Sequence, residues 1–268
     1  MKHKYELGFI GCGNMGSAIL RGIISKNVIS PGRLAVSDID TTKIKNLSVG
    51  WKGYDTNYIV RNSNRILLAV KPQVIRDVLK DVATVIPIKT LLISIAAGIS
   101  IKKLTEFLEG HKRIIRVMPS TPALVGFGAA AITSLRNNVP DKDMSFTKRI
   151  FESVGIVAFV AEKHIDAVTA LSGSGPAYFF YLTEHLITAG RKMGLPCELV
   201  QRFSLQTALG SAELAVKSNQ PPQILRKNVT SPGGTTEAAI KLLDDNKWGD
   251  LFIKAVLRAE SRARELGG

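Results

Sequence analysis

The chain has 268 residues, of which 45% are apolar and 22% charged, so it can form one large or two modest packed domains, and wholesale disorder or a collagen-like character is excluded. The formal net charge of +14 is spread along the chain rather than gathered in a basic helix, so we interpret it as a solvated surface that attracts anionic ligands, not as a nucleic-acid interface. The two cysteines fit no ligand spacing and no apolar stretch has bilayer length, so we expect no disulfide framework, no metal site, no membrane contact and a cytoplasmic location.

The first half of the chain alternates short β-branched runs with helical patterns, which is typical of a parallel sheet joined by crossover helices. The expected strands are Leu7–Ile10, Leu34–Ser37, Ile66–Val70, Leu91–Ser94, Ile114–Met118, Ala129–Thr133 and Ile156–Val160. Met15–Ser25 and Ile101–Leu108 have helical periodicity, and Pro72 stands where a first helical turn tolerates proline. We therefore expect residues 1–161 to form a doubly wound, Rossmann-type α/β domain.

Strand patterns stop after Glu162, and the apolar positions beyond it follow helical periodicity. The expected helices are Asp166–Leu171, Ala177–Met193, Glu198–Lys217, Thr235–Asp244 and Asp250–Leu266. Residues 162–268 are therefore expected to form an all-α domain. Within it, Pro176–Leu182 is apolar on every side, and a helix without a polar face must be buried. We expect a second subunit to cover it; a core helix within one chain is the alternative.

Gly11–Gly16 has the pattern G-x-G-x-x-G between an expected strand and an expected helix, which is the context that a dinucleotide site requires. Gly11 allows a tight turn, Gly13 lets the backbone approach a pyrophosphate, and Gly16 lets the helix pack on the strand. The pyrophosphate would then meet the free N–H groups of the helix N-terminus. A tight loop without a ligand is the alternative interpretation.

Asp38 follows the second expected strand, where an acidic residue accepts hydrogen bonds from the adenosine ribose of NAD. Its charge would repel the 2′-phosphate of NADP, although Ser37, Thr41, Thr42 and Lys43 could supply donors to that phosphate. A solvated loop aspartate is the alternative. Both NADH and NADPH therefore stay open, with Asp38 favouring NADH.

Three further segments, Val70–Pro72, Ile95–Gly98 and Met118–Pro122, each lie at the carboxyl end of an expected strand. Open α/β sheets bind ligands at the carboxyl ends of their strands, so we expect these segments to line the cofactor. Each segment alone has the composition of an ordinary strand-to-helix turn.

In the helical half, Leu171–Ala177 and Ser231–Thr236 are turns of small residues that directly precede expected helices. Their N–H groups and hydroxyls suit a carboxylate, although plain helix caps have the same composition. None of the four histidines lies near these turns in sequence, so a hydrolytic triad has little support.

Five motifs in combination indicate a protein family more specifically than any one of them does. They are G-F-I-G-C-G-N-M-G at Gly8–Gly16, A-V-K-P at Ala69–Pro72, L-S-G-S-G-P-A-Y at Leu171–Tyr178, K-M-G-L-P at Lys192–Pro196 and S-P-G-G-T-T at Ser231–Thr236. Their order and spacing over nearly the whole chain resemble the pyrroline-5-carboxylate reductase family. The resemblance implies a reductase that converts the cyclic imine 1-pyrroline-5-carboxylate to L-proline with NADPH or NADH, the last step of proline biosynthesis.

With this resemblance, the motifs suggest which residues form the site. The expected substrate-binding residues are Ser174, Gly175, Asn228, Ser231, Gly233, Gly234, Thr235 and Thr236. The expected cofactor-binding residues are Gly11, Gly13, Asn14, Met15, Ser37, Asp38, Asn57, Ala69, Val70, Lys71, Pro72, Ala96, Ala97, Gly98, Met118 and Pro119. Thr236 is the candidate catalytic residue, because its hydroxyl could orient the ring nitrogen and assist proton transfer. The resemblance also implies a dimer, or a dimer-based higher oligomer, whose shared surface completes each site.

Three positions depart from the family pattern. Ser120 stands where the family usually has Asn, and Lys227 stands where Asp commonly precedes the Asn-Val pair. Asp38 stands where small or basic residues often hold the 2′-phosphate of NADPH. These departures concern nicotinamide placement, support of the substrate loop and cofactor preference, respectively.

Two other functions are compatible with a Rossmann-type domain. A β-hydroxyacid dehydrogenase shares the two-domain plan, but it carries a lysine on the helix after its glycine-rich turn, and Ala177–Thr183 contains none. A non-catalytic dinucleotide sensor, or a basic nucleic-acid binder, is the second alternative. Loss of nicotinamide absorbance on adding pyrroline-5-carboxylate distinguishes an imine reductase from these alternatives.

Overall fold

The computed structural model describes residues 4–45, 47, 53–135 and 138–267. The chain divides into two compact units: Met1–Gly173 together with Ala259–Gly268, and Ser174–Arg258. None of the helices in the described ranges combines the length and the hydrophobicity that crossing a membrane requires.

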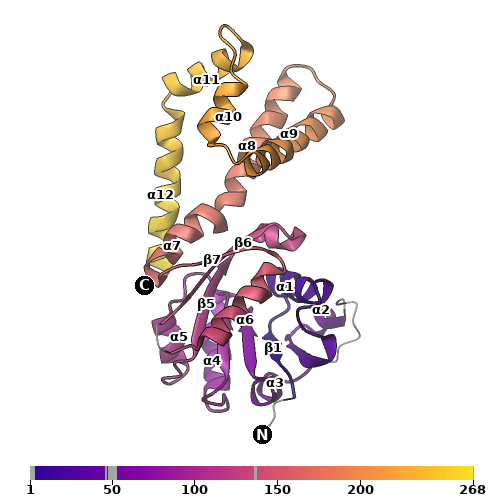
Figure 1. Ribbon diagram of the computed structural model, residues 1–268, viewed down its shortest axis with the longest axis vertical. Helices are drawn as coiled ribbons and strands as arrows, with labels where there is room; N and C mark the ends of the chain where they lie inside the picture. Colours follow the sequence, from indigo (N-terminus) through magenta and orange to yellow (C-terminus); the bar gives the residue numbers. More distant parts are fainter. Residues whose placement is uncertain (1–3, 46, 48–52, 136–137, 268) are drawn as a thin grey trace. The chain divides into compact units, whose positions relative to one another are not determined.

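A seven-stranded sheet forms the centre of the first unit (Figure 1). Its strands are β1 (Leu7–Ile10), β2 (Leu34–Ser37), β3 (Arg65–Leu68), β4 (Leu91–Ser94), β5 (Ile114–Pro119), β6 (Gly128–Ser134) and β7 (Gly155–Phe159). Their order is β2-β1-β3-β4-β5-β6-β7, and β1 to β5 run parallel to one another. The chain therefore winds from β1 toward both edges of the sheet, as expected for a doubly wound fold.

Strand β6 departs from the expected parallel arrangement, because it pairs antiparallel with β5. Only the segment 120–127 joins the two strands, with a 3-10 turn at Thr121–Val125, whereas a parallel crossover needs about a dozen residues or more. Strand β7 pairs parallel with β6 after the crossover helix α6 (Asp141–Glu152). The sheet is therefore mixed, and the length of the β5–β6 connection explains the direction of β6.

Helices cover both faces of this sheet, and the side chains of its parallel strands alternate between two buried clusters. Besides α6, the helices are α1 (Asn14–Ser25), α2 (Thr41–Lys45), α3 (Thr56–Asn62), α4 (Ile75–Ala83) and α5 (Ile101–Phe107). One cluster packs Leu67 and Ile93 with α1 and α6, and the other packs Ile66 and Leu92 with α3, α4 and α5. Burial on both faces explains why these strands are continuous apolar runs in the sequence.

A buried carboxylate fastens the amino-terminal edge of the sheet. Asp143, in the first turn of α6, is 1% exposed. Its Oδ1 accepts a hydrogen bond from Arg65 Nε at 3.0 Å and lies 3.0 Å from Arg65 Nη2 in an ion pair, and its Oδ2 accepts a hydrogen bond from Arg113. The Arg65 guanidinium also lies 4.0 Å from the centre of the Phe146 ring. Because Arg65 begins β3 and Arg113 directly precedes β5, one side chain of α6 holds the starts of two strands.

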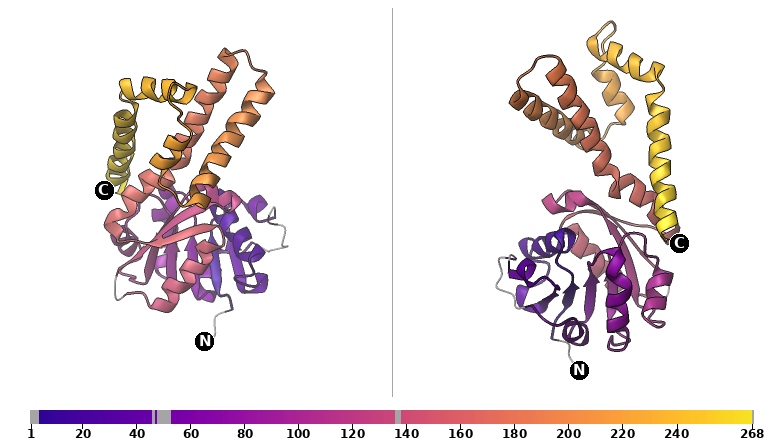
Figure 2. Two further views of the ribbon diagram at one scale, coloured as in Figure 1. Left: turned by 45° about the horizontal axis from the view of Figure 1, so that its top comes forward. Right: turned by 180° about the vertical axis from the view of Figure 1, so that it is seen from behind.

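The second unit is entirely helical. It contains α8 (Gly175–Lys192), α9 (Cys197–Ser218), α10 (Pro222–Asn228), α11 (Thr235–Asp245) and the first part of α12 (Trp248–Gly267). Helices α8 and α9 lie side by side (Figure 2). Gly190 permits this approach, because a Cβ there would stand 2.7 Å from Val200 Cγ1. Among residues 174–258, all of which the structure describes, Val200 is the only buried apolar side chain.

The apolar start of α8 is not buried within one chain. Phe179, Phe180 and Tyr181 are 67%, 63% and 63% exposed. The interpretation of Pro176–Leu182 as a core helix of a single chain is therefore wrong. These side chains need a surface that their own unit does not supply.

Candidate active site

The carboxyl ends of the parallel strands bring the expected cofactor segments to one edge of the sheet (Figure 1). Gly11 follows β1, Asp38 follows β2, Ala69 to Pro72 follow β3, Ala96 to Gly98 follow β4, and Met118 and Pro119 end β5. Backbone hydrogen bonds extend the sheet into these loops: Gly11 N–H donates to Ser37 O, and Ala69 N–H donates to Ile10 O, both at 2.8 Å. The prediction that these segments share one edge is confirmed.

The first loop at this edge is tightly packed at two glycines and open at the third. Gly11 has a φ of +98°, and a Cβ there would stand 2.6 Å from Ala69 O. A Cβ at Gly16 would stand 2.5 Å from Gly11 O, so α1 packs directly on the loop. Around the Cβ position of Gly13, by contrast, the described part of the chain leaves 4 Å of open space. That opening fits a pyrophosphate, which must approach the backbone closely.

Helix α1 begins at this opening. Gly13 is its N-cap residue and supplies no side-chain cap to the first amides. The N–H groups of the first turn, which includes Asn14 and Met15, have no partner within the helix, and the helix dipole places positive charge beside them. This end of α1 therefore suits a negatively charged ligand.

Cys12 lies inside the glycine loop but does not offer a reactive thiolate. Its side chain is buried, and burial together with the negative charge of Asp38 raises the pKa of its thiol to about 12. The thiol is therefore protonated at neutral pH. Within the described ranges, no group of three His, Cys, Asp or Glu side chains could hold a metal ion.

The Asp38 carboxylate points at the glycine loop rather than at solvent. Its side chain is 7% exposed, and its Oδ2 accepts a hydrogen bond from Cys12 N–H at 2.6 Å. Its Oδ1 accepts one from Asp40 N–H at 2.8 Å and lies 3.6 Å from Lys43 Nζ. Asp38 therefore stabilises the loop, and Lys43 reduces the repulsion that a 2′-phosphate would meet there.

A buried oxygen at the start of α3 has no partner. Asn57 Oδ1 is inaccessible to solvent, and no described residue donates a hydrogen bond to it. Its neighbour Thr56 is engaged, with Oγ1 2.9 Å from Ser37 Oγ. An unsatisfied buried acceptor is unfavourable by about 1–3 kcal/mol, and a hydroxyl of a bound dinucleotide could satisfy it. The orphaned oxygen and the opening at Gly13 both fit such a cofactor.

A π-helical turn at Thr169–Gly173 interrupts what the sequence predicts as one helix from Asp166. Helix α7 spans Ile165–Val168, and the wider turn follows it. Gly173 packs against the β5 end, because a Cβ there would stand 2.7 Å from Met118 Cε. π turns recur at functional sites. Here the turn determines where the Met118 side chain, an expected cofactor contact, can lie.

Two of the departures from the family pattern have structural explanations. Ser120 is buried, and its Oγ accepts a hydrogen bond from Ala129 N–H at 2.9 Å, which closes the β5–β6 connection. Lys227 lies exposed in the last turn of α10, where a cation interacts favourably with the helix dipole.

The expected substrate turn before α11 has the features of a type II β-turn. Gly234 N–H donates to Ser231 O at 3.0 Å, so Pro232 and Gly233 occupy the central positions. Gly233 has a φ of +71°, which this turn requires at its second central position. A Cβ at Gly234 would stand 2.5 Å from Ser231 Oγ. The order Ser-Pro-Gly-Gly therefore fits the conformation of the turn.

Glu237 is a residue of this turn that sequence reasoning missed. Its Oε2 accepts a hydrogen bond from Gly233 N–H at 2.7 Å. Part of the signal was present in the sequence, because a Glu at the third position of a helix often accepts from a backbone N–H at the helix start, as in a capping box, although the N-cap residue here is Gly234 and not Ser or Thr.

The expected substrate residues form two groups within the second unit. Ser174 and Gly175 lie at the start of α8, whereas Asn228 and the turn Ser231–Gly234 precede α11, with Thr235 and Thr236 in its first turn. The starts of α8 and α11 lie well apart in Figure 1 and Figure 2. One chain therefore does not bring the two groups together.

A doubly wound sheet with a glycine-rich first loop, followed by a helical unit, defines an NAD(P)H-dependent oxidoreductase with a Rossmann-type domain. Two family models agree with this class. The model described as NADP oxidoreductase, coenzyme F420-dependent, matches residues 6–98, and that described as pyrroline-5-carboxylate reductase dimerisation matches residues 162–266. The chain belongs to the pyrroline-5-carboxylate reductase family.

Full-length relatives support this assignment. Pyrroline-5-carboxylate reductase of Arabidopsis thaliana is 37% identical over 98% of this chain and 96% of its own length. The solved pyrroline carboxylate reductase of Plasmodium falciparum, with NADP bound, is 36% identical with a TM-score of 0.88 over 100% of both chains. That of Coxiella burnetii is 35% identical with a TM-score of 0.90 over 99% of both.

Proposed function

We propose that this chain reduces the C=N bond of 1-pyrroline-5-carboxylate to give L-proline, with NADPH or NADH as reductant. The strongest support is the segment Ser231–Thr236, because it lies in the region that the family model matches and leaves the amides of Thr235 and Thr236 without a partner in the helix, free for a carboxylate. The test is to add pyrroline-5-carboxylate to the purified chain with each cofactor. We expect nicotinamide absorbance to fall while an equal amount of proline forms; no oxidation of either cofactor would reject the proposal.

The residues of the chain have the task of positioning the reactants. When bound, the reduced nicotinamide supplies a hydride to the imine carbon, and the ring nitrogen takes up a proton. The proposed cofactor contacts are the residues gathered at the carboxyl edge of β1 to β5, with Gly13 and the start of α1 at the pyrophosphate. Holding two reactants in one geometry can account for a large part of such a rate enhancement.

Thr236 is the proposed catalytic residue. It is partly buried in the first turn of α11, two residues after Gly234, so the helix fixes the direction of its side chain. As hydride arrives, the ring nitrogen changes from a planar imine or iminium to an amine, and a hydroxyl beside it can orient the ring and assist proton transfer. The turn Ser231–Gly234 would place the free amides of Thr235 and Thr236 against the substrate carboxylate, with Asn228 supporting the turn.

We propose that both NADH and NADPH serve as cofactors. The buried Asp38 carboxylate favours a ribose with free hydroxyls, while Lys43 lies close enough to reduce its repulsion of a 2′-phosphate. The NADP bound in the Plasmodium falciparum relative supports use of NADPH. Because Lys43 partly neutralises Asp38, we expect the kcat/KM values for NADH and NADPH to be similar. An unpaired Asp38 would make them differ more.

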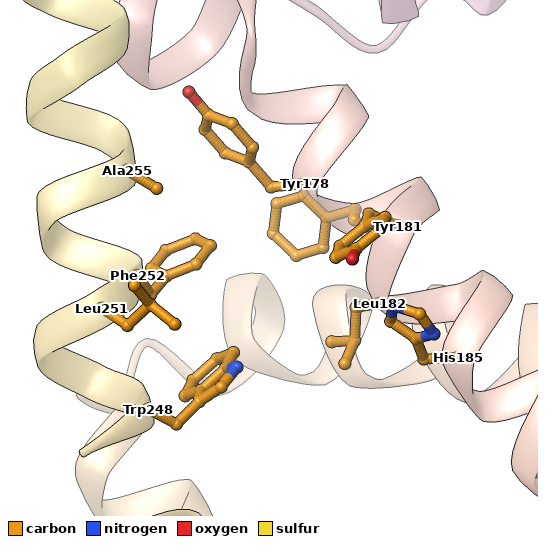
Figure 3. Close-up of a pocket in the computed structure, with 9 residues that line it drawn as sticks. Tyr178, Tyr181, Leu182, His185, Trp248, Leu251, Phe252 and Ala255 are labelled. Carbon is orange, nitrogen blue, oxygen red and sulfur yellow. The ribbon is translucent and has the colours of Figure 1, made fainter. Parts of the chain in front are cut away.

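The chain carries the dimerisation domain of its family, and its helical unit has an apolar groove suited to self-association. The groove has a volume of about 520 Å³ and lies between α8 and α12 (Figure 3). It is lined by Tyr178, Phe179, Tyr181, Leu182, His185, Trp248, Leu251, Phe252 and Ala255. Trp248 stacks on Phe252 at 5.4 Å between ring centres, which leaves a rigid aromatic wall. We propose that a second copy covers this groove in a dimer or a dimer-based higher oligomer.

A shared site follows from the same proposal. Because one chain keeps Ser174 and Gly175 apart from the Ser231–Thr236 turn, we propose that the two copies of a dimer together complete each substrate site.

We further propose that the functional division of the chain lies between residues 161 and 162, since the family's dimerisation region begins at residue 162. A cytoplasmic location is also proposed, on the evidence of the two free cysteines.

A further inference from the structure

We infer that Glu237 is a positioning residue for substrate binding. It locks the Ser231–Gly234 turn by occupying the Gly233 amide, so that the substrate carboxylate meets the next amides of the helix instead. This inference rests on the proposed imine reduction and adds a residue to its machinery.

The hydrogen bonds around the turn show which amides are taken. Gly233 N–H donates to Glu237 Oε2 at 2.7 Å, and Gly234 N–H donates to Ser231 O at 3.0 Å. The first bond within the helix runs from Ala238 N–H to Gly234 O at 3.2 Å. The amides between these bonds precede the helical ladder and have no partner within the helix. They are the amides of Thr235, Thr236 and Glu237.

The turn requires an additional stabilising interaction to hold one conformation, because it contains two adjacent glycines. Glycine loses more conformational freedom on ordering than any other residue, and Gly233 must hold a φ of +71°. Without Glu237, the bond from Gly234 to Ser231 would hold the turn alone. The carboxylate adds a charge-assisted bond from a side chain fixed on α11, so the turn is ordered before substrate arrives.

The hydrogen bond and the charge of Glu237 have opposite effects on a substrate carboxylate. The bond to Gly233 orders the turn and favours binding, whereas the negative charge next to the free amides opposes it. Two substitutions separate these effects. Glu237→Gln keeps an acceptor of equal reach without the charge, and Glu237→Ala removes both.

The matched control is Asp245→Ala. It removes the same charge from the far end of the same helix, where Asp245 pairs with Lys241 at 3.1 Å. The measurements are the KM for pyrroline-5-carboxylate, kcat, the KM for NADPH, the Tm, and the exchange rate of the Gly233 amide by NMR.

We expect Glu237→Ala to raise the KM for pyrroline-5-carboxylate by up to about tenfold, the size of a helix-capping interaction, with little change in the KM for NADPH. The Gly233 amide should exchange faster in this variant. Glu237→Gln should restore slow exchange and give a KM at or below that of the wild type. Asp245→Ala should change neither quantity.

Unchanged KM and unchanged Gly233 exchange in Glu237→Ala would overturn the inference. Equal losses of Tm in both Glu237 variants with an unchanged KM would also overturn it, since Glu237 would then be a helix cap only. If the wild type does not reduce the imine at all, the proposed function fails, and the exchange rates alone decide whether Glu237 locks the turn.

Discussion

The two compact units of this chain differ in where their apolar side chains lie. The first unit buries side chains such as Leu7, Phe9 and Ile66 completely, in clusters on both faces of its sheet. The second unit buries Val200 alone among its apolar side chains and leaves the aromatic start of α8 exposed. Internal packing therefore accounts for the stability of the first unit, whereas the second leaves apolar side chains that only a surface outside that unit can cover.

The two halves also differ in charge. Residues 1–161 contain 23 Lys and Arg against 11 Asp and Glu, while residues 162–268 contain 13 against 11. The excess positive charge thus lies in the half that we propose binds an anionic dinucleotide, where it favours encounter. The near balance in the helical half limits repulsion between two copies.

The largest effect is expected from a charge on the exposed face of α8. Phe180→Asp should abolish self-association and activity, because an unpaired buried carboxylate is unfavourable by several kcal/mol and a symmetric dimer would contain two. Sedimentation at micromolar concentration measures the mass. The control is Ile88→Asp, because Ile88 is equally apolar and 85% exposed, but belongs to the first unit. If both variants keep the wild-type mass, the exposed apolar face of α8 is not an association surface, and the proposed difference between the two units is wrong.

The next effect tests the internal packing of the first unit. Asp143→Ala should lower the free energy of unfolding by about 3–5 kcal/mol, because it leaves Arg65 and Arg113 without their buried counter-ion. Urea denaturation followed by circular dichroism measures the change. Glu152→Ala, which removes an exposed partner of Lys148 on the same helix, should cost less than about 1 kcal/mol. Similar losses in both variants would contradict a special role for Asp143.

A smaller effect concerns the chemistry of the second unit. Thr236→Ala should lower kcat by about tenfold or more, while the Tm and the KM for NADPH stay near those of the wild type. Thr236→Ser keeps the hydroxyl and should retain much of the activity. Thr188→Ala is the control, because Thr188 is an exposed threonine of α8 whose hydroxyl donates to Glu184 O, one turn earlier in the same helix. Wild-type turnover in a folded Thr236→Ala variant would remove Thr236 from the mechanism.

The smallest effect concerns cofactor choice in the first unit. Asp38→Ser should shift the ratio of kcat/KM values toward NADPH by about tenfold, which corresponds to about 1.4 kcal/mol. Asp81→Ser is the matched control, because Asp81 is an exposed carboxylate in α4 of the same unit and does not belong to the glycine loop or its neighbours. Equal ratios in the wild type and in Asp38→Ser would show that the carboxylate does not influence the ribose.

The strands were the most predictable part of the fold. Leu7–Ile10, Leu34–Ser37 and Leu91–Ser94 have the expected bounds, because strands buried on both faces are short runs of β-branched and aliphatic residues. The direction of β6 was predicted wrongly, since a strand pattern does not encode direction and the expected parallel sheet is antiparallel at β5–β6. Helix α6 was also missed, although Phe146 and Ile150 have the i, i+4 spacing of an amphipathic helix. Helix α10 was missed because it is short and begins at two adjacent prolines, Pro221 at its N-cap and Pro222 as its first residue.

The candidate site was predictable where it depends on backbone conformation. Gly11, Gly233 and the strand ends follow from glycine patterns and sheet topology, which are local features of the sequence. The contact of Asp38 with Cys12 N–H and the orphaned Asn57 Oδ1 were not predictable, because they depend on packing between segments distant in sequence. The separation of Ser174 from Ser231 likewise depends on the tertiary arrangement of the helices.

The protonated, buried Cys12 has a practical consequence for labelling. Thiol-directed reagents such as maleimides react with an accessible thiolate, and Cys12 offers neither accessibility nor, at neutral pH, the anion. Cys197, the first residue of α9, is exposed. A maleimide dye should therefore mark each chain once, in the helical unit, without disturbing the glycine loop. The natural sequence thus already permits fluorescence measurements of subunit exchange without removal of a cysteine.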